Sequence, residues 1–517
     1  VVHQKEKMVA PSLALCGLSL FLCLLGRIVD ALRSPVTKID FFATTVRGLE
    51  KVLSDEIKAL PGSSRVTIGS SSVSFKGTIE TGVEALMWLR TPLKLMEKIA
   101  ECDCVASKDV LFDWISSIEW SHIISPDHTL KCDTVLGQNN PSDLRHSHFT
   151  SLTIKNAIID QFRSRKEFAG ARPSVDIVDP DLPLLLYLHR AEGTLYRVWS
   201  GEGSMHKRGY RSASIHKAAL RESTAAGLLL STDWLNAWHS LSSEPIDNNQ
   251  IPGPVSLCDP MCGSGTFAIE AALMAADTAP GLLRYAAEAT PIIDTRMNMN
   301  TGSQDSADAT TSSATSATIS STVPCPLRWI DMYAASTPIW DEAWEVAKRR
   351  DQRGRMNSVN NDPVVLVNDA NPASIKLAIA GAGNAGVHRM IEFSCKDVAD
   401  YCPTRRPSVI VTNPPWDRRL DGADDAWRKL NCFLERLQNN NDEDSREEEE
   451  EECLGDGSKN SDKSPIALSE LQVWTLTGNE EITQQLTAMH STQRLPVRAA
   501  SVNMAFYQWK FQDLMGN

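Results

Sequence analysis

A short apolar run that ends in two prolines sets the strongest limit on how this chain can fold. Residues 408–412 read Ser-Val-Ile-Val-Thr, and Asn413, Pro414, Pro415 and Trp416 follow directly. The run has the length and composition of a buried parallel strand, and the prolines make the turn after it rigid. Open α/β sheets bind ligands at the carboxyl ends of such strands. The sequence therefore predicts a strand tip with a side-chain amide and an aromatic face, which suits a planar amine.

A glycine-rich turn lies upstream, between another apolar run and a predicted helix. Residues 255–258 read Val-Ser-Leu-Cys, and residues 259–266 read Asp-Pro-Met-Cys-Gly-Ser-Gly-Thr. Gly263 and Gly265 let the backbone come close to a ligand. The amides at the start of the helix offer hydrogen-bond donors and a partial positive charge. We therefore expect an anionic group, such as a carboxylate, to bind at this turn.

A third apolar run carries an acid at its end. Residues 364–367 read Val-Val-Leu-Val and lead into Asn368 and Asp369, after which a helix is predicted over residues 371–385 with Gly386 as its stop. An acidic residue at the end of a strand in this position is well placed to accept hydrogen bonds from ribose hydroxyls. Asp369 is the candidate for that role.

In this order, the glycine turn, the strand-end acid and the Asn-Pro-Pro-Trp segment resemble the S-adenosylmethionine-dependent methyltransferases that modify exocyclic amines of nucleic-acid bases. The resemblance implies that Asn413 and the Pro414 carbonyl accept hydrogen bonds from the amine while Trp416 stacks on the base; Pro415 completes the catalytic segment. It implies S-adenosylmethionine as cofactor, with these binding residues: Asp259, Pro260, Met261, Cys262, Gly263, Gly265, Thr266, Asp369, Ala370, Asp397 and Val398. For Asp397, which follows the run 391–394, a solvated turn acid is the alternative interpretation.

The predicted site has a chemical rationale in the weak nucleophilicity of an aromatic amine, whose lone pair is delocalised into the ring. Two acceptors that face its hydrogens favour a more tetrahedral nitrogen and stabilise the positive charge that develops during methyl transfer. Alignment of nucleophile and methyl group contributes roughly 7–11 kcal/mol in favourable systems. The base has to leave its stack to reach such a site.

Two further segments narrow the resemblance to one group of RNA methyltransferases. Residues 42–50, Phe-Ala-Thr-Thr-Val-Arg-Gly-Leu-Glu, are similar to the opening of THUMP-containing RNA methyltransferases, and residues 200–211 resemble the junction before their catalytic domain. Residues 476–479 and 504–509 also match the final strands of the K/L-type enzymes, which form N2-methylguanosine in large-subunit ribosomal RNA. The likeness covers roughly 39–512. It implies an RNA partner contacted by Lys207, Arg208, Tyr210 and Arg211.

The chain departs from the family pattern at two motif positions. Trp416 stands where tyrosine is usual, so a stacking face is kept and the phenol is lost. Asn371 stands where the family often carries a second acid, which leaves the role of Asp369 in place.

We predict an α/β fold, with a Rossmann-like doubly wound methyltransferase sheet preceded by an α+β THUMP/ferredoxin-like RNA-binding module. The 517 residues are divided into a leader at 1–36, the RNA-binding module at 37–200 and the methyltransferase domain at 201–517. Low-complexity insertions are predicted near 298–322, which is rich in Ser, Thr, Ala and Asp, and near 439–464, which is acidic; neither carries enough apolar side chains to order itself.

The net charge of −13 argues at first against a nucleic-acid partner, because phosphate recognition needs basic surface. Residues 442–452 alone carry −8, which leaves −5 for the rest of the chain. Residues 201–221 hold five basic residues and one acid, so a local basic strip is present. A solvated charged face is the alternative interpretation of that strip.

Twelve cysteines are scattered without a CxxC pair or a zinc-ligand spacing, so we predict reduced, mostly buried thiols and no metal site. Some RNA methyltransferases use a cysteine nucleophile, but the Pro-Pro segment has none. We expect Cys262 to pack beside the cofactor.

The N-terminal residues make the location of the protein uncertain. Met8 to Gly26 is an uncharged, largely apolar run preceded by Lys5 and Lys7. A signal or transit peptide, a retained membrane anchor and an artefact of gene prediction all fit this pattern. The catalytic body is expected to be soluble, in the cytoplasm or an organelle.

The predicted function is an S-adenosylmethionine-dependent RNA guanine-N2 methyltransferase that takes part in rRNA processing. A transfer-RNA guanine-N2 or an adenine-N6 nucleic-acid methyltransferase fits the same four catalytic residues. A catalytically inactive RNA-binding ribosome assembly factor is the alternative of another class. Residues 263–268 also fit a permissive dinucleotide pattern, but a dehydrogenase has no need of Asn-Pro-Pro-Trp, and no Lys follows the glycines to bind ATP.

Overall fold

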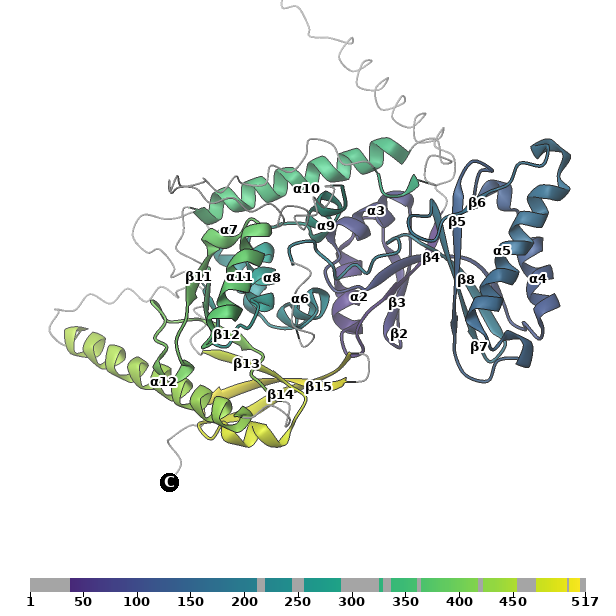
Figure 1. The fold of residues 1–517 in the computed structure, drawn as a ribbon. Helices are drawn as coiled ribbons and strands as arrows, with labels where there is room; N and C mark the ends of the chain where they lie inside the picture. The colour runs from purple at the N-terminus through teal and green to yellow at the C-terminus, as the bar shows by residue number, and fades with distance from the viewer. Residues whose placement is uncertain are drawn as a thin grey trace, which may run out of the picture.

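The computed structural model describes residues 38–211, 219–243, 255–289, 325–328, 336–359, 364–416, 422–452, 471–499 and 502–511. These residues form two β-sheets with helices packed on them, one in the N-terminal part of the chain and one in the C-terminal part (Figure 1). The predicted leader, 1–36, and the predicted insertion at 298–322 lie outside the described residues.

The N-terminal sheet has eight strands in the order β2-β3-β1-β4-β8-β7-β5-β6. Its strands are β1 (Ile39–Thr44), β2 (Ser64–Gly69), β3 (Ser72–Gly77), β4 (Lys94–Cys102), β5 (Thr129–Leu136), β6 (Ser174–Val175), β7 (Leu182–His189) and β8 (Glu192–Val198). Its helices are α2 (Glu50–Ala59), α3 (Ile79–Trp88), α4 (Lys108–Ser117) and α5 (Ser147–Ser164). The β4–β8 pair joins the first four strands to the last four, so this region is one continuous α+β sheet.

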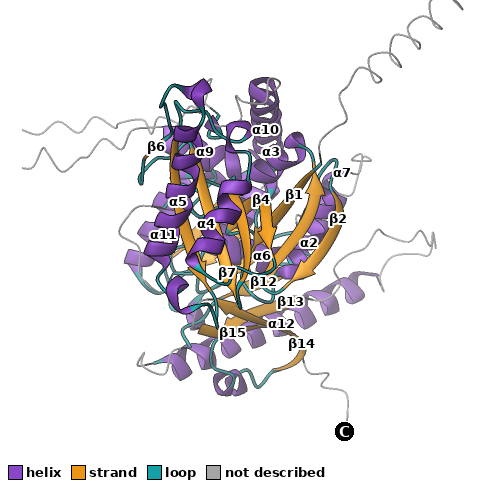
Figure 2. Cartoon of the chain, turned by 90° about the vertical axis from the view of Figure 1, so that its right-hand side faces the viewer, coloured by secondary structure: helices purple, strands orange, loops and turns teal. Residues whose placement is uncertain are grey.

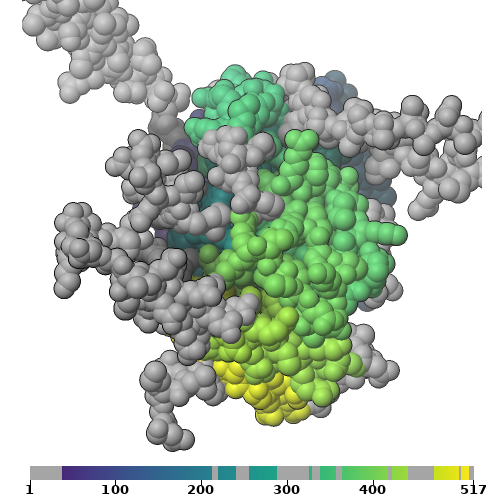
Figure 3. All heavy atoms as spheres, turned by 90° about the vertical axis from the view of Figure 1, so that its left-hand side faces the viewer, coloured from purple at the N-terminus to yellow at the C-terminus, as the bar shows by residue number. Residues whose placement is uncertain are grey.

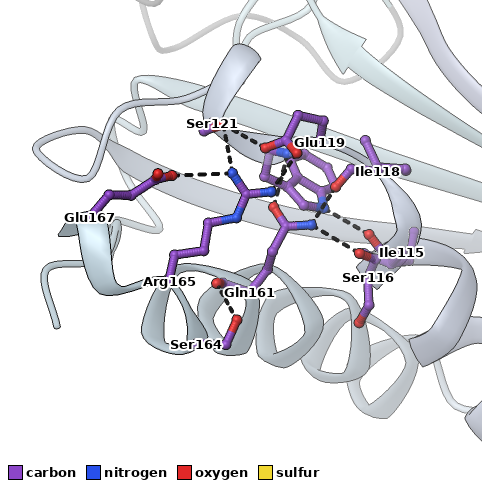
Figure 4. Close-up of polar contacts among 10 residues, drawn as sticks. Ile115, Ser116, Ile118, Glu119, Ser121, Gln161, Ser164, Arg165 and Glu167 are labelled. Carbon is purple, nitrogen blue, oxygen red and sulfur yellow. Dashed lines mark hydrogen bonds and ion pairs between the residues drawn. The ribbon is translucent and has the colours of Figure 1, made fainter. Parts of the chain in front are cut away.

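Helices α4 and α5 pack together over the β5 side of this sheet (Figure 2). Polar contacts fix the loop after α4 on α5 (Figure 4). The Gln161 amide donates to the carbonyls of Ser116 and Ile118 and accepts from the backbone N–H of Trp120. Arg165 forms an ion pair with Glu119 beside them. Because one side chain satisfies three backbone groups, the loop has a single position on the helix.

The C-terminal sheet has seven strands in the order β11-β10-β9-β12-β13-β15-β14. Its strands are β9 (Leu257–Asp259), β10 (Val365–Asn368), β11 (Ile391–Ser394), β12 (Val409–Thr412), β13 (Gln472–Thr477), β14 (Met489–Ala499) and β15 (Val502–Phe511). Strands β9 to β13 pair in parallel, and β15 and β14 add an antiparallel edge.

Helices and short turns complete the C-terminal region. The helices are α6 (Glu222–Leu230), α7 (Trp234–Ser243), α8 (Thr266–Ala275), α9 (Pro280–Ala289), α10 (Ser336–Val359), α11 (Pro372–Asn384) and α12 (Ala423–Glu452). The described 3-10 turns of the whole chain are η1 (Trp120–His122), η2 (Ser142–Leu144), η3 (Lys166–Phe168), η6 (His388–Met390), η7 (Val398–Asp400) and η8 (Glu481–Gln485). Figure 3 shows one face of the molecule, with residues of the α10 stretch (green-teal) at the top and residues near the C-terminus (yellow) at the bottom.

The central parallel strands are buried on both faces, as the apolar runs predict. Along β10, Val365 and Val367 belong to one hydrophobic cluster, whereas Leu366 belongs to another. In β12, Val409 and Val411 join the first cluster and Ile410 joins the second. Since successive side chains of a strand point to opposite faces, the two clusters lie on the two sides of the sheet. The doubly wound α/β fold is confirmed.

The two regions share their cores across the predicted boundary at residue 200. Helices α9 and α10 pack on α3, and Leu282, Trp340 and Trp344 belong to the cluster of the N-terminal sheet. In the other direction, Val46 and Leu49 belong to the cluster of the C-terminal sheet. Figure 1 shows α10 lying across both regions. The boundary in the sequence is therefore not a boundary in packing.

The acidic segment at the end of α12 differs from the prediction of an insertion that does not order itself over 439–464. The structure continues α12 as a helix to Glu452, and residues 453–464 lie outside the described part. The start of this helix packs its apolar face against η7 and η8, and Trp427, Leu430 and Leu434 are fully buried there. Helix formation propagates from a fixed first segment at little further cost, which accounts for the extension.

No helix among the described residues is long and apolar enough to cross a membrane.

A buried ion pair holds the two regions together and provides a test of their coupling. Arg208 is 1% exposed, lies 3.5 Å from the carboxylate of Glu270, which is fully buried, and donates to the carbonyls of Met205 and Arg90. Removal of one partner leaves the other charge buried and alone, so Arg208→Met is expected to lower the free energy of unfolding by about 3–5 kcal/mol. Urea denaturation measures this.

The double variant Arg208→Met with Glu270→Leu removes both charges and is expected to recover much of the loss. A cost below 1 kcal/mol for the single variant would contradict the role of this pair.

Candidate active site

Three predicted site segments lie at neighbouring strand tips. Strand β9 is paired in parallel with β10 on one side and β12 on the other. The glycine turn follows β9, Asp369 follows β10 and Asn413 follows β12. Because parallel strands end at the same edge of a sheet, all three segments lie together at the carboxyl edge. A reaction between groups bound at the first and last of these segments requires this arrangement.

The glycine turn has the backbone geometry that its sequence predicts. Gly263 and Gly265 have φ angles of +55° and +76°, which side-chain-bearing residues rarely adopt. A Cβ on Gly265 would lie 2.8 Å from the Cβ of Ala378 in α11, whereas a Cβ on Gly263 would meet nothing within 4 Å. Gly265 is therefore needed for packing, and Gly263 borders open space.

Asp369 connects the β10 tip to the glycine turn. Its carboxylate accepts hydrogen bonds from the backbone N–H of Gly263 at 2.8 Å and from that of Asn371 at 2.9 Å. Asn371 caps α11 by accepting from the N–H of Ala373 at 3.0 Å, which explains an amide at this position. Each oxygen of Asp369 keeps a lone pair, so the carboxylate can also accept from a ribose hydroxyl.

Asn368 is a site residue that the sequence reasoning passed over. Its side chain is fully buried and donates to the carbonyls of Pro260 at 3.2 Å and Lys396 at 3.0 Å. Its oxygen accepts from the N–H of Lys396 at 3.0 Å. The amide thus ties together the turns that follow β9, β10 and β11. The only signal in the sequence was one polar residue at the end of an apolar run.

Asp397 and Val398 follow β11, next to the tip of β10. The carboxylate of Asp397 accepts from the N–H of Ala399 at 3.0 Å and from Lys429 of α12 at 2.7 Å. The hydrogen bond from Lys429 lowers the pKa of Asp397 below its ordinary value. Val398 is buried in the hydrophobic cluster below the turn, while Ala370 is exposed. Asp397 remains half-exposed, so the remaining lone pairs of its carboxylate oxygens stay accessible to a ligand.

Asp259, Pro260, Cys262 and Thr266 are buried at the base of the turn, and Met261 is half-buried there. Burial raises the pKa of the Asp259 carboxyl to about 7 and raises the pKa of the Cys262 thiol well above its ordinary value. A thiol held in its neutral form is a poor nucleophile. Cys262 therefore packs in the turn and does not act as a nucleophile in this environment.

The Asn-Pro-Pro-Trp segment is held by indole hydrogen bonds. Trp416 donates from Nε1 to Oδ1 of Asn413 at 3.1 Å, and Trp427 of α12 donates to the carbonyl of Pro415 at 3.0 Å. Pro414 is buried and Pro415 is exposed. The Trp416 ring packs against Gly478, where an added Cβ would lie 2.4 Å from the ring. The Asn413 oxygen has two lone pairs, so one remains for a substrate amine.

The RNA-binding role predicted for the basic strip needs correction, because its four predicted contact residues differ in burial. Arg208 and Tyr210 are 1% and 2% exposed, and the Tyr210 hydroxyl donates to Glu270 at 3.1 Å, so neither reaches RNA in this conformation. Arg211 donates to Leu220 and Thr266 and lies 3.4 Å from Glu222, which places it under the glycine turn. Lys207 is exposed. These buried contacts join the two regions, and Lys207 is the one of the four predicted RNA contacts whose side chain is left free for a partner.

In the described part of the chain, no group of three or more His, Cys, Asp or Glu side chains is placed to hold a metal ion.

The raised pKa of Asp259 gives a pH test of the turn. A carboxyl with a pKa of about 7 when folded and about 4 when unfolded stabilises the fold at low pH, and this contribution is lost as pH rises from about 4 to 7. Asp259→Asn does not titrate. The free energy of unfolding of Asp259→Asn minus that of wild type is therefore expected to increase as pH rises from about 4 to 7, by up to about 4 kcal/mol. Urea titrations at several pH values measure it.

Asp127→Asn, at an exposed position, serves as the control and should follow the wild-type profile. A constant difference between Asp259→Asn and wild type across pH 4–7 would contradict the buried acid.

Comparisons with known proteins agree with this arrangement of sheets and loops. Family models match three consecutive stretches: the RlmL ferredoxin-like domain at residues 40–95, the THUMP domain at 105–198 and the RMKL-like methyltransferase domain at 252–447. The first two divide the N-terminal sheet, and the third contains the glycine turn, Asp369 and the Asn413 segment.

Curated relatives cover most of this chain. A protein named ribosomal RNA large subunit methyltransferase K/L from Syntrophotalea carbinolica is 31% identical over 408 residues, which are 78% of this chain and 48% of that protein. Its namesake from Desulfotalea psychrophila is 29% identical over 403 residues, 77% of this chain and 46% of that protein. The chain therefore spans about half the length of the curated relatives it matches.

Solved structures share the fold over nearly the whole chain. A possible methylase from Clostridium difficile 630 aligns with a TM-score of 0.64 at 20% identity, covering 93% of this chain and 100% of the other. SMU.472, which was solved in complex with SAH, gives 0.63 at 17% identity, with 92% and 99% covered. TrmN from Thermus thermophilus gives 0.52 at 14% identity, with 92% and 100% covered. The chain is therefore a THUMP-containing protein in which a RlmL ferredoxin-like domain and a THUMP domain precede an RMKL-like methyltransferase domain.

Proposed function

We propose that this protein is an S-adenosylmethionine-dependent RNA methyltransferase that forms N2-methylguanosine in large-subunit ribosomal RNA. The observation that carries the proposal is the position of the glycine turn, Asp369 and Asn413 at adjacent strand tips of one parallel sheet. The K/L names of the curated relatives support the base and the RNA class, and the SAH in the structure of SMU.472 supports the cofactor.

The residues of the β9 and β10 tips fit such a cofactor. The space above Gly263 is open. The helix α8 begins at Thr266, and its N-cap residue Gly265 has no side chain to cap it, so the first amides of the helix are available to a carboxylate. Asp369 offers acceptors for ribose hydroxyls, and Asp397 offers an acceptor for an adenine amine. When bound, S-adenosylmethionine would supply an electrophilic methyl group by cleavage of its S–CH3 bond, with neutral S-adenosylhomocysteine as the leaving group.

The chain's own contribution to the chemistry comes from Asn413 and Pro414. The free lone pair of Asn413 Oδ1 and the carbonyl of Pro414 accept the two hydrogens of the guanine amine. Acceptors in these positions stabilise the positive charge that forms on nitrogen as the new N–C bond forms. The proton is then lost to water. No described side chain has to act as a strong base, because the methylated nitrogen is acidic until it loses that proton.

The N-terminal sheet supports an RNA substrate. The THUMP domain and the ferredoxin-like domain form one surface joined to the catalytic region by shared cores. Because the two regions share their cores, RNA bound on the N-terminal sheet would be held in a limited range of positions relative to Asn413.

Transfer of a labelled methyl group tests the proposed reaction. Purified protein, labelled S-adenosylmethionine and an unmodified large-subunit ribosomal RNA transcript are expected to yield labelled N2-methylguanosine, identified by nucleoside mass spectrometry. Labelled N6-methyladenosine in the digest would contradict guanine as the modified base. Labelling of transfer RNA alone would contradict ribosomal RNA as the substrate.

Asn413→Ala separates binding from transfer. Because Asn413 contacts the amine and not the cofactor, calorimetry should give a cofactor Kd within two-fold of wild type, while kcat falls by about 10²–10³. Asn439→Ala, the same change at an exposed position of α12, should leave both unchanged. A kcat equal to that of wild type in Asn413→Ala would contradict the role of Asn413 in methyl transfer.

Trp416 is expected to act in two ways, by stacking on the base and by orienting the Asn413 amide. Trp416→Phe keeps a ring but loses the Nε1–H that holds Oδ1, so kcat should fall about 2–10-fold with KM for RNA little changed. Trp416→Ala loses the stacking face as well, worth about 1–3 kcal/mol, and should also raise KM. Equal kinetics for the Phe variant and wild type would show that the hydrogen bond has no role in orientation.

A further inference from the structure

Three arginines from distant parts of the sequence line one cavity between the two sheets. Arg47 lies just after β1, Arg221 lies at the start of α6 and Arg498 lies near the end of β14. The cavity has a volume of about 290 Å³, and Ser71 and Thr45 are also in its wall. We call it the arginine cleft. No part of the proposed methyl transfer uses it.

Backbone contacts between the two regions build the cleft. The N–H of Arg498 donates to the carbonyl of Arg47 at 2.9 Å. Next to it, Gly48 has a φ of +101°, and a Cβ there would lie 2.0 Å from the carbonyl oxygen of Pro496. A glycine is therefore required for the two chains to come this close. The contact fixes Arg47 and Arg498 side by side through their backbones and leaves their side chains for other partners.

The three guanidinium groups have no protein partner among the described residues. All three side chains are exposed, and no hydrogen bond or ion pair of theirs is formed within the described ranges. No acidic residue lines the cavity. The acid next to it is Glu50, whose two oxygens accept from the N–H groups of Gly48 and Ser71. Three arginines thus line one cavity beside the carboxylate of Glu50, whose oxygens are already engaged by backbone amides, so the local charge is positive and favours binding of an anion.

The surroundings of the cleft are also positive. Loss of hydration on burial, followed by the charges of Arg221, Arg208, Lys207 and Arg211, lowers the pKa of His206 to about 4. His206 is therefore neutral near pH 7 and adds no charge of its own. Arg208 and Arg211 are paired with Glu270 and Glu222, so Arg221 and Lys207 are the exposed charges of this group.

The cleft opens at the same edge of the sheet as the catalytic loops. The end of β13 pairs with the start of β15 at Thr477 and Ala505, and the end of β14 pairs with β15 at Ala499 and Val502. Arg498 therefore lies at the carboxyl edge. From β12 to β14 the sheet order passes three strand spacings, a separation of roughly 14 Å. That span fits a short run of single-stranded nucleotides.

We propose that the arginine cleft binds a backbone phosphodiester of the substrate RNA, a few nucleotides from the base that enters the Asn413 segment. The proposal rests on the proposed function. Arginine matches a phosphate by paired N–H donors, and phosphate contacts fix the register of a nucleic acid without reading its sequence. The cleft spans both regions, so one phosphate held there sets the position of the RNA relative to both sheets.

The salt dependence of RNA binding tests the proposal with the full chain. The triple variant Arg47→Gln, Arg221→Gln, Arg498→Gln is compared with wild type by filter binding to an unmodified large-subunit ribosomal RNA transcript. Loss of this one phosphate contact should lower the slope of log K against log salt by about 0.7–1 and weaken binding about ten-fold at 100 mM salt. The corresponding triple lysine variant should keep the wild-type slope.

Two controls make the result specific. Arg389→Gln removes an exposed arginine at the amino end of β11, away from the carboxyl edge, and should bind RNA as wild type does. A cofactor Kd equal to that of wild type, measured by calorimetry, shows that each variant is folded.

The outcomes separate the two proposals. If the glutamine variant keeps the wild-type slope while wild type methylates the RNA, the cleft proposal is overturned and the proposed function stands. If wild type neither binds nor methylates RNA, both proposals fail.

Discussion

The buried amide of Asn368 is the interaction on which the geometry of the candidate site depends. It joins the turns after three parallel strands through Pro260 and Lys396, and Asp369 beside it holds Gly263. A buried amide without these partners would cost about 1–3 kcal/mol for each polar group left unsatisfied. The three turns therefore have one low-energy arrangement relative to one another. A donor site and an acceptor site on separate loops can only work together when the loops keep such an arrangement.

Residues 47–50 show how four consecutive residues connect the two regions. Arg47 lines the cleft, and Gly48 allows the close approach of Pro496. Leu49 is fully buried in the core of the catalytic region, and Glu50 satisfies the amides of Gly48 and Ser71. Each side chain, or its absence, has a separate physical task. The segment therefore belongs to the N-terminal sheet in sequence and to the catalytic sheet in packing.

Sequence reasoning located the strands and turns that local pattern determines. The apolar runs before Asp259, Asp369 and Asn413 became buried parallel strands because their length and β-branched content leave little choice. Local pattern carries no information on burial of charge, so Arg208 and Tyr210 were expected on the surface and are instead in the contact between the regions. The arginine cleft was missed for a related reason, since Arg47 and Arg498 meet only through the tertiary fold.

Helices α9 and α10 lie in the stretch that matches the methyltransferase domain, yet Leu282, Trp340 and Trp344 complete the core of the N-terminal sheet. A fragment that stops at residue 200 would present that apolar surface to water. The N-terminal region is therefore not a self-contained unit, and a fragment or fusion built on it would have to include both helices. In a chimera between two such proteins, this apolar contact would stay matched only if both helices came from the same parent as the N-terminal sheet.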